Sequence, residues 1–173
     1  TYNTYSHDQD NTNSITLDEI RSIYEYIAET IWVGTYGKGL DKFNKETETF
    51  THFVNVPDNN QSLSNNFIRT IYEDRSRNLW IGTEGGGLNK FDRATNTFQN
   101  FKAELNDSSS LNSDYIFTIH ESPEGILWLG TWGGGLNRFN IKNNKAEHFT
   151  TKDGLPSNAV YGILEDEKGN LWL

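Results

Sequence analysis

The chain has 173 residues, of which 34% are hydrophobic and 13% aromatic, and its 15 glycines against 3 prolines are typical of a turn-rich globular protein rather than a disordered one. Its 24 acidic and 15 basic residues give a net charge of −9, which argues against nucleic acid as a partner and against contact with an anionic membrane surface. Because cysteine is absent, disulfide frameworks, thiolate nucleophiles and thiolate zinc sites are excluded.

In chain order, the sequence predicts short strands separated by turns. Residues 1–5 are expected to form one outer strand, and four-stranded units are expected at 20–53, 67–101 and 115–149, followed by a partial unit at 159–173. In the second unit, the segment "IRTIYE" is predicted to be a strand, named strand a, with Ile68, Thr70 and Tyr72 on one side and Arg69, Ile71 and Glu73 on the other. The segments "LWIGT", "LNKFD" and "TFQNF" follow as strands b, c and d. No apolar stripe has a sustained helical spacing, so the expected class is all-β.

The units are copies of one repeat. The segment "IWVGTYGKGLDKFN" at 31–44 recurs as "LWIGTEGGGLNKFD" at 79–92 and "LWLGTWGGGLNRFN" at 127–140, with an offset of 48 residues each time. A fourth copy begins at "NLWL", 44 residues further on, after a shorter connector. Such periods are typical of propeller blades. The sequence therefore predicts a β-propeller segment of four-stranded antiparallel blades, with about three and a half blades in the chain.

Several residues at fixed places in the repeat are predicted to hold this scaffold together. A blade cannot bury both of its faces alone, so the recurring tryptophans are expected to lie between neighbouring blades. The glycines of the turn between strands b and c are expected to adopt positive φ, which glycine does without a steric penalty. The predicted structural residues are Trp32, Trp80, Trp128, Trp172, Gly39, Gly87 and Gly135.

The two ends of the predicted segment leave the ring open. Residues 1–5 belong to the place of an outer strand, and 159–173 to the place of strands a and b, so together they could form a composite blade. That blade would form within one chain, as a strained four-bladed ring, or between two chains. Otherwise the missing blades belong to a longer parent protein, of which this chain is a fragment.

The segments "NNFIRTIYEDRSRNLWIGTEGGGLNKFD" and "SNAVYGILEDEKGNLWL" resemble the two-component regulator propeller repeat, with its Asp, its turn Gly, its apolar-Trp pair and its Gly-Thr-x-x-Gly-Gly-Leu run. The first copy departs from this pattern at "YIAET", residues 26–30, and the third departs at Ser122 and Pro123. The resemblance implies a seven-bladed propeller on the periplasmic or extracellular side of a bacterial membrane-bound sensor. It also implies an oligosaccharide ligand and a kinase output domain outside this chain.

Other motifs favour structural roles. The segment "GTEGGGL" at 82–88 is followed by a strand rather than by the helix that a phosphate loop needs, so it is interpreted as a hairpin turn. His52 and His148 match in strand d, with Asn100 between them in the series, and no spacing indicates a metal site. No motif indicates an enzyme or a cofactor. One glutamate recurs in every copy, which suits a scaffold better than a unique active site: Glu25, Glu73, Glu121 and Glu165.

A ligand is expected on the face that carries the long connectors between strands d and a, which are rich in Asn, Asp and Ser. Since strands alternate in direction, the turns between strands b and c lie on that same face. One turn position varies as Tyr36, Glu84 and Trp132, and an exposed aromatic ring beside polar groups suits a sugar. The candidate ligand-binding residues are Tyr36, Lys38, Glu84 and Trp132. The alternative is that Tyr36 and Trp132 pack against the connector of the next blade.

Three functions remain in competition. The leading hypothesis is a non-catalytic segment of an extracytoplasmic two-component sensor, which binds oligosaccharide on the long-loop face and passes a rigid-body change to a partner subunit. The first alternative is a protein-interaction or self-assembly scaffold, which would expose a large apolar patch. The second is a lyase or hydrolase resembling streptogramin lyases. It would need a histidine and carboxylate cluster facing the central channel, which the four histidines, His120 included, do not obviously supply.

Overall fold

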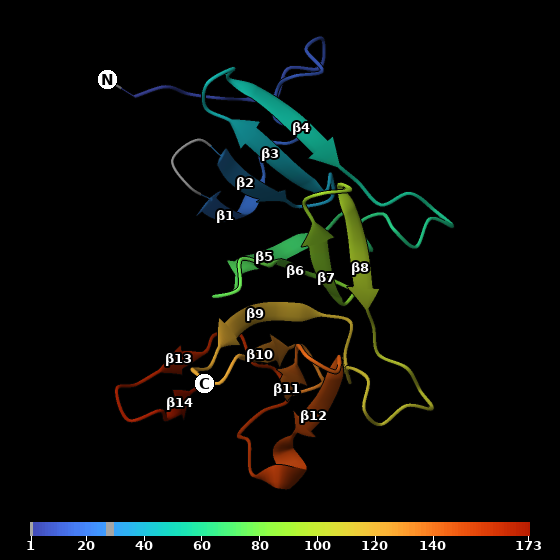
Figure 1. The fold of residues 1–173 in the computed structure, drawn as a ribbon, viewed down its shortest axis with the longest axis vertical. Coiled ribbons are helices and arrows are strands. Elements are labelled where there is room, and N and C mark those ends of the chain that lie inside the picture. The colour runs from blue at the N-terminus through green and yellow to red at the C-terminus, as the bar shows by residue number, and fades with distance from the viewer. Residues whose placement is uncertain (1, 27–29) are drawn as a thin grey trace.

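The computed structural model describes residues 2–26 and 30–173 as a row of antiparallel sheets stacked in chain order (Figure 1). Three sheets have four strands each, and in each of them sequence neighbours pair with one another. They form blade 1 with β1 (Ile20–Tyr26), β2 (Thr30–Thr35), β3 (Leu40–Asn44) and β4 (Thr49–Phe53), blade 2 with β5 (Ile68–Glu73), β6 (Leu79–Thr83), β7 (Leu88–Asp92) and β8 (Thr97–Phe101), and blade 3 with β9 (Ile116–Glu121), β10 (Ile126–Thr131), β11 (Leu136–Asn140) and β12 (Lys145–Phe149). The predicted all-β propeller segment is confirmed.

Blade 4 is a pair of short strands. Its strands are β13 (Leu164–Glu165) and β14 (Leu171–Trp172), which follow the single 3-10 turn η1 (Thr151–Asp153). Strand a was expected from residue 159 onward, but in the structure the two strands of this blade pair over only two residues each. No helix in the described ranges is long and apolar enough to cross a bilayer.

The outer strand expected at residues 1–5 is not formed. Thr1 lies outside the described residues, and residues 2–5 carry no strand, since no neighbouring strand is present to pair with them. Tyr5 nevertheless keeps its place in the repeat. Its ring lies 4.7 Å from the ring of Phe43, just as Phe53, one repeat later, lies 5.1 Å from Phe91. The N-terminal segment therefore covers the outer half of blade 1 without forming a strand.

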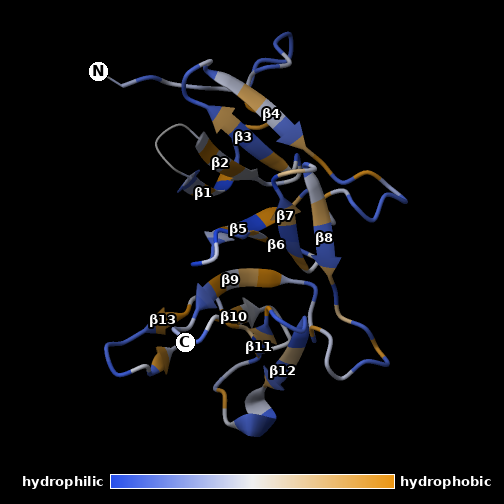
Figure 2. Ribbon diagram, in the orientation of Figure 1, coloured by the Kyte–Doolittle hydropathy of each residue, from blue (hydrophilic) through white to orange (hydrophobic). Residues whose placement is uncertain are grey.

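The core lies between the blades. Trp32 of blade 1 packs against Phe91 of blade 2 at 5.0 Å, and Trp80 of blade 2 packs against Phe139 of blade 3 at 5.9 Å. Both indoles are almost fully buried, at 1% and 0% exposed. Figure 2 shows β9, the inner strand of blade 3, coloured largely as hydrophobic. The two interfaces between complete blades are thus built from matching residues.

The last two repeated tryptophans depart from this pattern. Trp128 is only partly buried and lines a 540 Å³ pocket together with Leu171 of blade 4. Trp172 is 64% exposed. Since each indole is covered by a phenylalanine on strand c of the following blade, a two-stranded blade 4 cannot cover Trp128 fully, and nothing in the described chain covers Trp172.

The turns between strands b and c lie on the same face as the connectors, as expected from the alternation of strand direction. The N–H groups of Gly39, Gly87 and Gly135 donate to connector carbonyls at 2.9, 2.8 and 2.8 Å. Their φ angles are +88°, +76° and +72°, and a Cβ on each would lie 2.1 to 2.3 Å from a backbone oxygen of strand d. A side chain at these turns would therefore be strained and would also clash.

The aspartate of the repeat holds the turn between strands a and b. Asp74 accepts the indole N–H of Trp80 at 2.8 Å and the backbone N–H of Asn78 at 2.8 Å. Asp166 repeats this geometry, and the hydrogen bonds it accepts from Asn170 lower its pKa to about 2. In blade 3 the hydroxyl of Ser122 instead donates to Glu124 at 2.7 Å. The unusual turn of the first copy, at 26–30, lies largely outside the described residues.

Candidate functional site

The loop-face ends of the inner strands form a continuous surface, here called the inner rim. Blades 1 to 3 each contribute a residue of strand a and a residue of the turn between strands b and c, blade 4 contributes one residue at the strand a position, and the connector ends add two aromatic residues. The inner rim consists of Arg21, Tyr36, Phe67, Arg69, Glu84, Tyr115, Phe117, Trp132 and Tyr161. The turn residue of one blade forms a bridge to the start of the next inner strand, as Tyr36 does with Phe67 and Glu84 with Tyr115.

Tyr36, at the first predicted position, is held between two neighbours. Its ring lies 4.9 Å from Phe67 in an edge-to-face arrangement, and the Arg21 guanidinium lies 4.6 Å from the ring centre. Tyr36 is half-buried in this position. The predicted contact with the next blade's connector is therefore present here, and it leaves part of the ring accessible.

Glu84, at the second predicted position, faces the guanidinium of Arg69 at 3.3 Å. The side chain of Arg69 also lies over the Phe117 ring of blade 3, at 4.5 Å from its centre. This position thus places one carboxylate and one guanidinium beside aromatic carbon. Both charged groups remain partly accessible to a ligand, since the side chains of Glu84 and Arg69 are 20% and 30% exposed.

Trp132, at the third predicted position, is 57% exposed. Its indole lies 5.6 Å from the Phe117 ring and 6.3 Å from the Tyr161 ring, edge-on to both. Phe117 and Tyr161 stack on each other at 5.3 Å with an interplanar angle of 28°. Trp132 therefore packs edge-on against the Phe117 and Tyr161 rings, and more than half of its surface remains accessible to a ligand.

Four aromatic side chains of the inner rim are substantially exposed, which is unusual for rings of this size in one region. Their exposed fractions are 41% for Phe67, 48% for Tyr115, 57% for Trp132 and 60% for Tyr161. Flat rings of this kind can bind the apolar face of a sugar or of another planar group, while the Arg69 and Glu84 pair can fix its orientation by hydrogen bonds. The arrangement is suited to binding.

The strand a position of the rim, which reads Arg21, Arg69, Phe117 and Tyr161 in successive copies, was not predicted to belong to the site. A signal was available, because this position changes from arginine to an aromatic residue between copies, whereas the nearby isoleucines Ile23, Ile71 and Ile119 stay constant. The aromatic connector ends, Phe67 and Tyr115, were also missed.

Lys38 lies apart from the other predicted site residues. It is exposed and lines a separate 320 Å³ pocket with His7, Thr16 and His52, under the N-terminal connector. The corresponding positions in blades 2 and 3 are glycines, Gly86 and Gly134. The structure therefore brings Tyr36, Glu84 and Trp132 into one rim and leaves Lys38 outside it.

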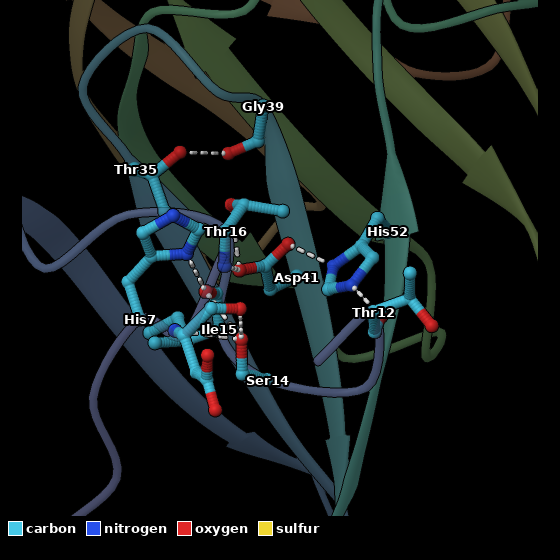
Figure 3. A network of polar contacts seen from close by, with 10 residues as sticks. His7, Thr12, Ser14, Ile15, Thr16, Thr35, Gly39, Asp41 and His52 are labelled. Atoms are coloured by element: carbon cyan, nitrogen blue, oxygen red, sulfur yellow. Dashed lines mark hydrogen bonds and ion pairs between the residues drawn. The ribbon is translucent and has the colours of Figure 1, made fainter. Parts of the chain in front are cut away.

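The pocket beside Lys38 is bordered by a polar network that fastens the connector (Figure 3). The buried carboxylate of Asp41 accepts both the backbone N–H and the hydroxyl of Thr16 at 2.8 Å, and it contacts His52 Nδ1 at 2.8 Å. The other ring nitrogen of His52 bonds the Thr12 carbonyl at 2.9 Å. The matching His148 bonds the Ser110 carbonyl at 2.7 Å, so both histidines of strand d hold connectors.

Changing Asp41 should show that this network serves stability. In Asp41→Ala, the Thr16 N–H and the His52 ring lose a buried acceptor, so the free energy of unfolding is expected to fall by about 2 to 3 kcal/mol. Asp41→Asn should cost less than about 1 kcal/mol, because asparagine holds the connector at this place in blades 2 and 3. Urea unfolding measures both, and equal losses would contradict this role.

The recurring glutamates lie at contacts within and between blades. Glu73 bonds Arg77 and Arg93 of its own blade at 2.7 and 2.6 Å, whereas Glu121 accepts the backbone N–H of Arg75 in the preceding blade. Burial, and then the charge of Glu73, raise the pKa of Tyr24 across the interface between blades 1 and 2. These contacts are those of scaffold residues.

His120 belongs to the same series of contacts. It occupies the place of Tyr24 and Tyr72 in its copy of the repeat, and its Nε2 lies 2.6 Å from Glu165 of blade 4. It is thus part of an interface between blades rather than of a separate cluster. Among the described residues, no group of three or more His, Asp or Glu side chains is arranged to hold a metal ion.

A family model and a solved structure both match this chain. Residues 62–85, 110–133 and 154–173 match the model of the family described as two component regulator propeller. The extracellular domain of the putative hybrid two component system BT3049 from B. thetaiotaomicron is 29% identical over 97% of this chain, with a TM-score of 0.83. No significant match exists among curated proteins.

Two further solved structures share the fold. The extracellular domain of the putative hybrid two component system BT4673 from B. thetaiotaomicron is 24% identical over 99% of this chain, with a TM-score of 0.78. The computationally designed Ika4 protein is 13% identical over 99% of this chain and 97% of its own length, with a TM-score of 0.55. The present chain spans only 23% and 24% of the two B. thetaiotaomicron domains.

Proposed function

We propose that this chain, which carries two component regulator propeller repeats, is a ligand-sensing segment of the extracellular region of a bacterial two-component sensor, and that it binds an oligosaccharide at the inner rim. The setting is supported by the extracellular domain of a putative hybrid two component system, which matches nearly all of this chain. It would place the segment on the periplasmic or extracellular side of the membrane, with the output domain elsewhere in the parent protein.

The observation that carries the ligand assignment is the group of exposed rings around Trp132. A pyranose presents one apolar face that stacks on a flat ring and a periphery of hydroxyls that seek charged or amide partners. The rim offers both within a short distance, since Trp132 stands beside Tyr161 and Phe117, and Phe117 carries Arg69 on its other side. A neutral sugar suits the part of the rim beside Trp132, where Arg69 and Glu84 already neutralise each other.

The proposed role is non-catalytic. The recurring glutamates of strand a lie at contacts within and between blades. His120 occupies the position of Tyr24 and Tyr72 and contacts Glu165 of blade 4, so it belongs to an interface between blades. A ligand on the rim would touch several blades at once, because Arg69 of blade 2, Phe117 of blade 3 and Tyr161 of blade 4 follow one another. Binding would therefore favour one relative placement of the blades, which is a rigid-body signal that a partner subunit can detect.

The test is the melting temperature of the chain across a panel of plant and host oligosaccharides. A ligand present at about 100 times its Kd should add roughly 2.7 kcal/mol of stability, which raises Tm by several degrees at this size. Trp132→Ala should lose that rise. The matched control Tyr2→Ala, which removes a ring that is 93% exposed and outside the rim, should keep it. A rise of equal size in Trp132→Ala would overturn the assignment to the rim.

A second function is favoured by a different observation. The connector between β4 and β5 also exposes apolar side chains, Val54 at 42% and Val56 at 46%, which suits a protein-interaction or self-assembly scaffold. If no sugar changes the Tm of a cooperatively melting chain, this function becomes the better account.

A further inference from the structure

The connectors that enter blades 1 and 2 each cover a pocket at the same place in the repeat. In blade 1 the pocket has a volume of 320 Å³ and is lined by the connector together with Lys38 and His52. In blade 2 it has a volume of 430 Å³, and Asn100 takes the place of His52. Blade 2 lies between two complete blades, so a pocket under the connector belongs to the repeat itself. The residues that line it can therefore be compared copy by copy.

At the start of the connector, His7 of blade 1 makes the contact that an asparagine makes in blade 2. Asn55 donates a side-chain N–H to the Leu63 carbonyl at 2.8 Å, and His7 places its Nδ1 at 2.8 Å from the Ile15 carbonyl (Figure 3). A carbonyl only accepts, so Nδ1 is the nitrogen that carries the hydrogen. The second ring nitrogen, Nε2, has no hydrogen-bond partner in the described part of the chain. Histidine thus adds a nitrogen that holding the connector does not require.

Lys38 stands at a turn position where the other two complete copies have glycine, Gly86 and Gly134. In those copies the connector closes on the turn, because an added Cβ would lie 2.5 Å from Ser64 Oγ in blade 2 and 2.3 Å from Asn112 Oδ1 in blade 3. Atoms this close clash, so a residue with a Cβ needs a connector that lies farther from the turn. Blade 1 provides that space and places a long cationic side chain beside it.

The acidic side chains around this pocket are already engaged. Each accepts a hydrogen bond from the connector backbone: Asp8 from Asp10, Asp18 from His7 and Asp41 from Thr16. Both ring nitrogens of His52 are occupied as well, one by Asp41 and one by the Thr12 carbonyl. Lys38, in contrast, has no carboxylate within 4.0 Å of its Nζ among the described residues. The groups that remain for a ligand are the Lys38 ammonium and His7 Nε2.

We propose that the pocket beside Lys38 binds a small acidic hydroxy compound of the size of one sugar acid. The Lys38 ammonium would contact the oxygens of a carboxylate or sulfate group, and His7 Nε2 would accept a hydrogen bond from a neighbouring hydroxyl. The volume of 320 Å³ lies at the lower end of the range of about 300 to 1,000 Å³ typical of ligand pockets, which limits the ligand to a small one. The pocket is separate from the inner rim, so this proposal does not rest on sugar binding there.

The test follows the ring signals of His7 by NMR while D-glucuronate or D-glucose 6-sulfate is added at constant ionic strength. A saturable shift at His7 is expected with at least one of the two acids, and the acid that binds tells whether the oxyanion is a carboxylate or a sulfate. D-glucose, which has the hydroxyls but no charge, should bind about tenfold more weakly or less. The ring of His148, in strand d of blade 3, should stay in place and serves as the internal control.

Two variants copy the residues of blade 2. Lys38→Gly removes the charge and should weaken binding about tenfold or more, whereas Lys142→Gly removes the same charge from a turn between strands c and d and should bind like the wild type. His7→Asn keeps the contact with the Ile15 carbonyl, as Asn55 does in blade 2, but removes Nε2. It should therefore bind more weakly, as followed at the backbone amide signal of Lys38, while its melting temperature stays unchanged.

The proposal is overturned by a His7 ring that does not shift with either acid, or by D-glucose that binds as tightly as the acids. It is also overturned if Lys38→Gly or His7→Asn binds as tightly as the wild type, or if Lys142→Gly loses binding equally. A Trp132 signal that moves while His7 stays in place would leave the inner rim as a sugar site and contradict only the pocket beside Lys38.

Discussion

Replacing Trp80 with alanine is expected to lower the free energy of unfolding by about 3 to 5 kcal/mol, the range typical for removal of a large buried aromatic side chain. The indole is 0% exposed, lies 5.9 Å from Phe139 of the next blade and donates its N–H to Asp74 at 2.8 Å. The substitution therefore opens a cavity between two blades and removes a buried hydrogen bond. Urea unfolding followed by circular dichroism measures the loss.

The control for this prediction is Trp132→Ala, which removes the same side chain from an exposed place. Trp132 is 57% exposed and makes only edge-on contacts with two rings. Its removal is expected to change the stability by no more than about 0.5 to 1 kcal/mol. If Trp80→Ala and Trp132→Ala lose similar free energies of unfolding, burial of Trp80 between two blades is not the source of its contribution to stability.

Gly82→Val is expected to cost about 3 kcal/mol or more, because strand b of blade 2 touches the inner strand of blade 3 at this glycine. A Cβ at residue 82 would lie 2.6 Å from the Thr70 methyl and 2.8 Å from a methyl of Ile116. Ile116 is 0% exposed and cannot move away without separating the blades. The φ angle of Gly82 is not positive, so the expected loss is steric and arises from Thr70 within blade 2 and from Ile116 across the interface.

The matched control is Gly162→Ala, at a glycine whose added Cβ would meet nothing within 4 Å. That variant should be unchanged or more stable by up to about 1 kcal/mol, through the reduced freedom of the unfolded chain. Thermal unfolding of the two variants beside the wild type compares them directly. If Gly82→Val melts like the wild type, the blades are not in the close contact described here.

The scaffold could be predicted from the sequence because the same pattern of strands and turns occurs in three successive copies. An offset of 48 residues between matching strands fixed the three complete blades, and the observed strands fall within the expected units. The aspartate-to-tryptophan hydrogen bond is local, so it is set by residues close in sequence. The strict alternation expected along "IRTIYE" was wrong, because a bulge between Ile68 and Thr70 shifts the register and leaves both Ile68 and Ile71 buried. The N-terminal strand was predicted wrongly, because a strand needs a partner that the repeat pattern alone does not supply.

The inner rim could be predicted only in part. The variable turn position led to Tyr36, Glu84 and Trp132, each of which forms a bridge to the start of the following blade. Arg69 and Phe117 were missed because alternation along a strand shows which side chains share a side, but not which side faces the open rim; that depends on how the blades stack. Lys38 was grouped with the turn residues by sequence, yet it lines the connector pocket with His7 and His52. The glycines at the corresponding positions of blades 2 and 3, Gly86 and Gly134, gave no indication of where a side chain would lie.

The most direct test of the proposed rim follows the indole N–H signals of the chain's 5 tryptophans by NMR while an oligosaccharide that raises Tm is added. The indoles report separate places, since Trp32 and Trp80 are buried between blades, Trp172 stands at the C-terminal end and Trp132 stands on the rim. The account predicts that the Trp132 signal shifts in a saturable way while those of Trp32 and Trp80 stay in place. A saturable shift at Trp172 with an unmoved Trp132 would contradict it.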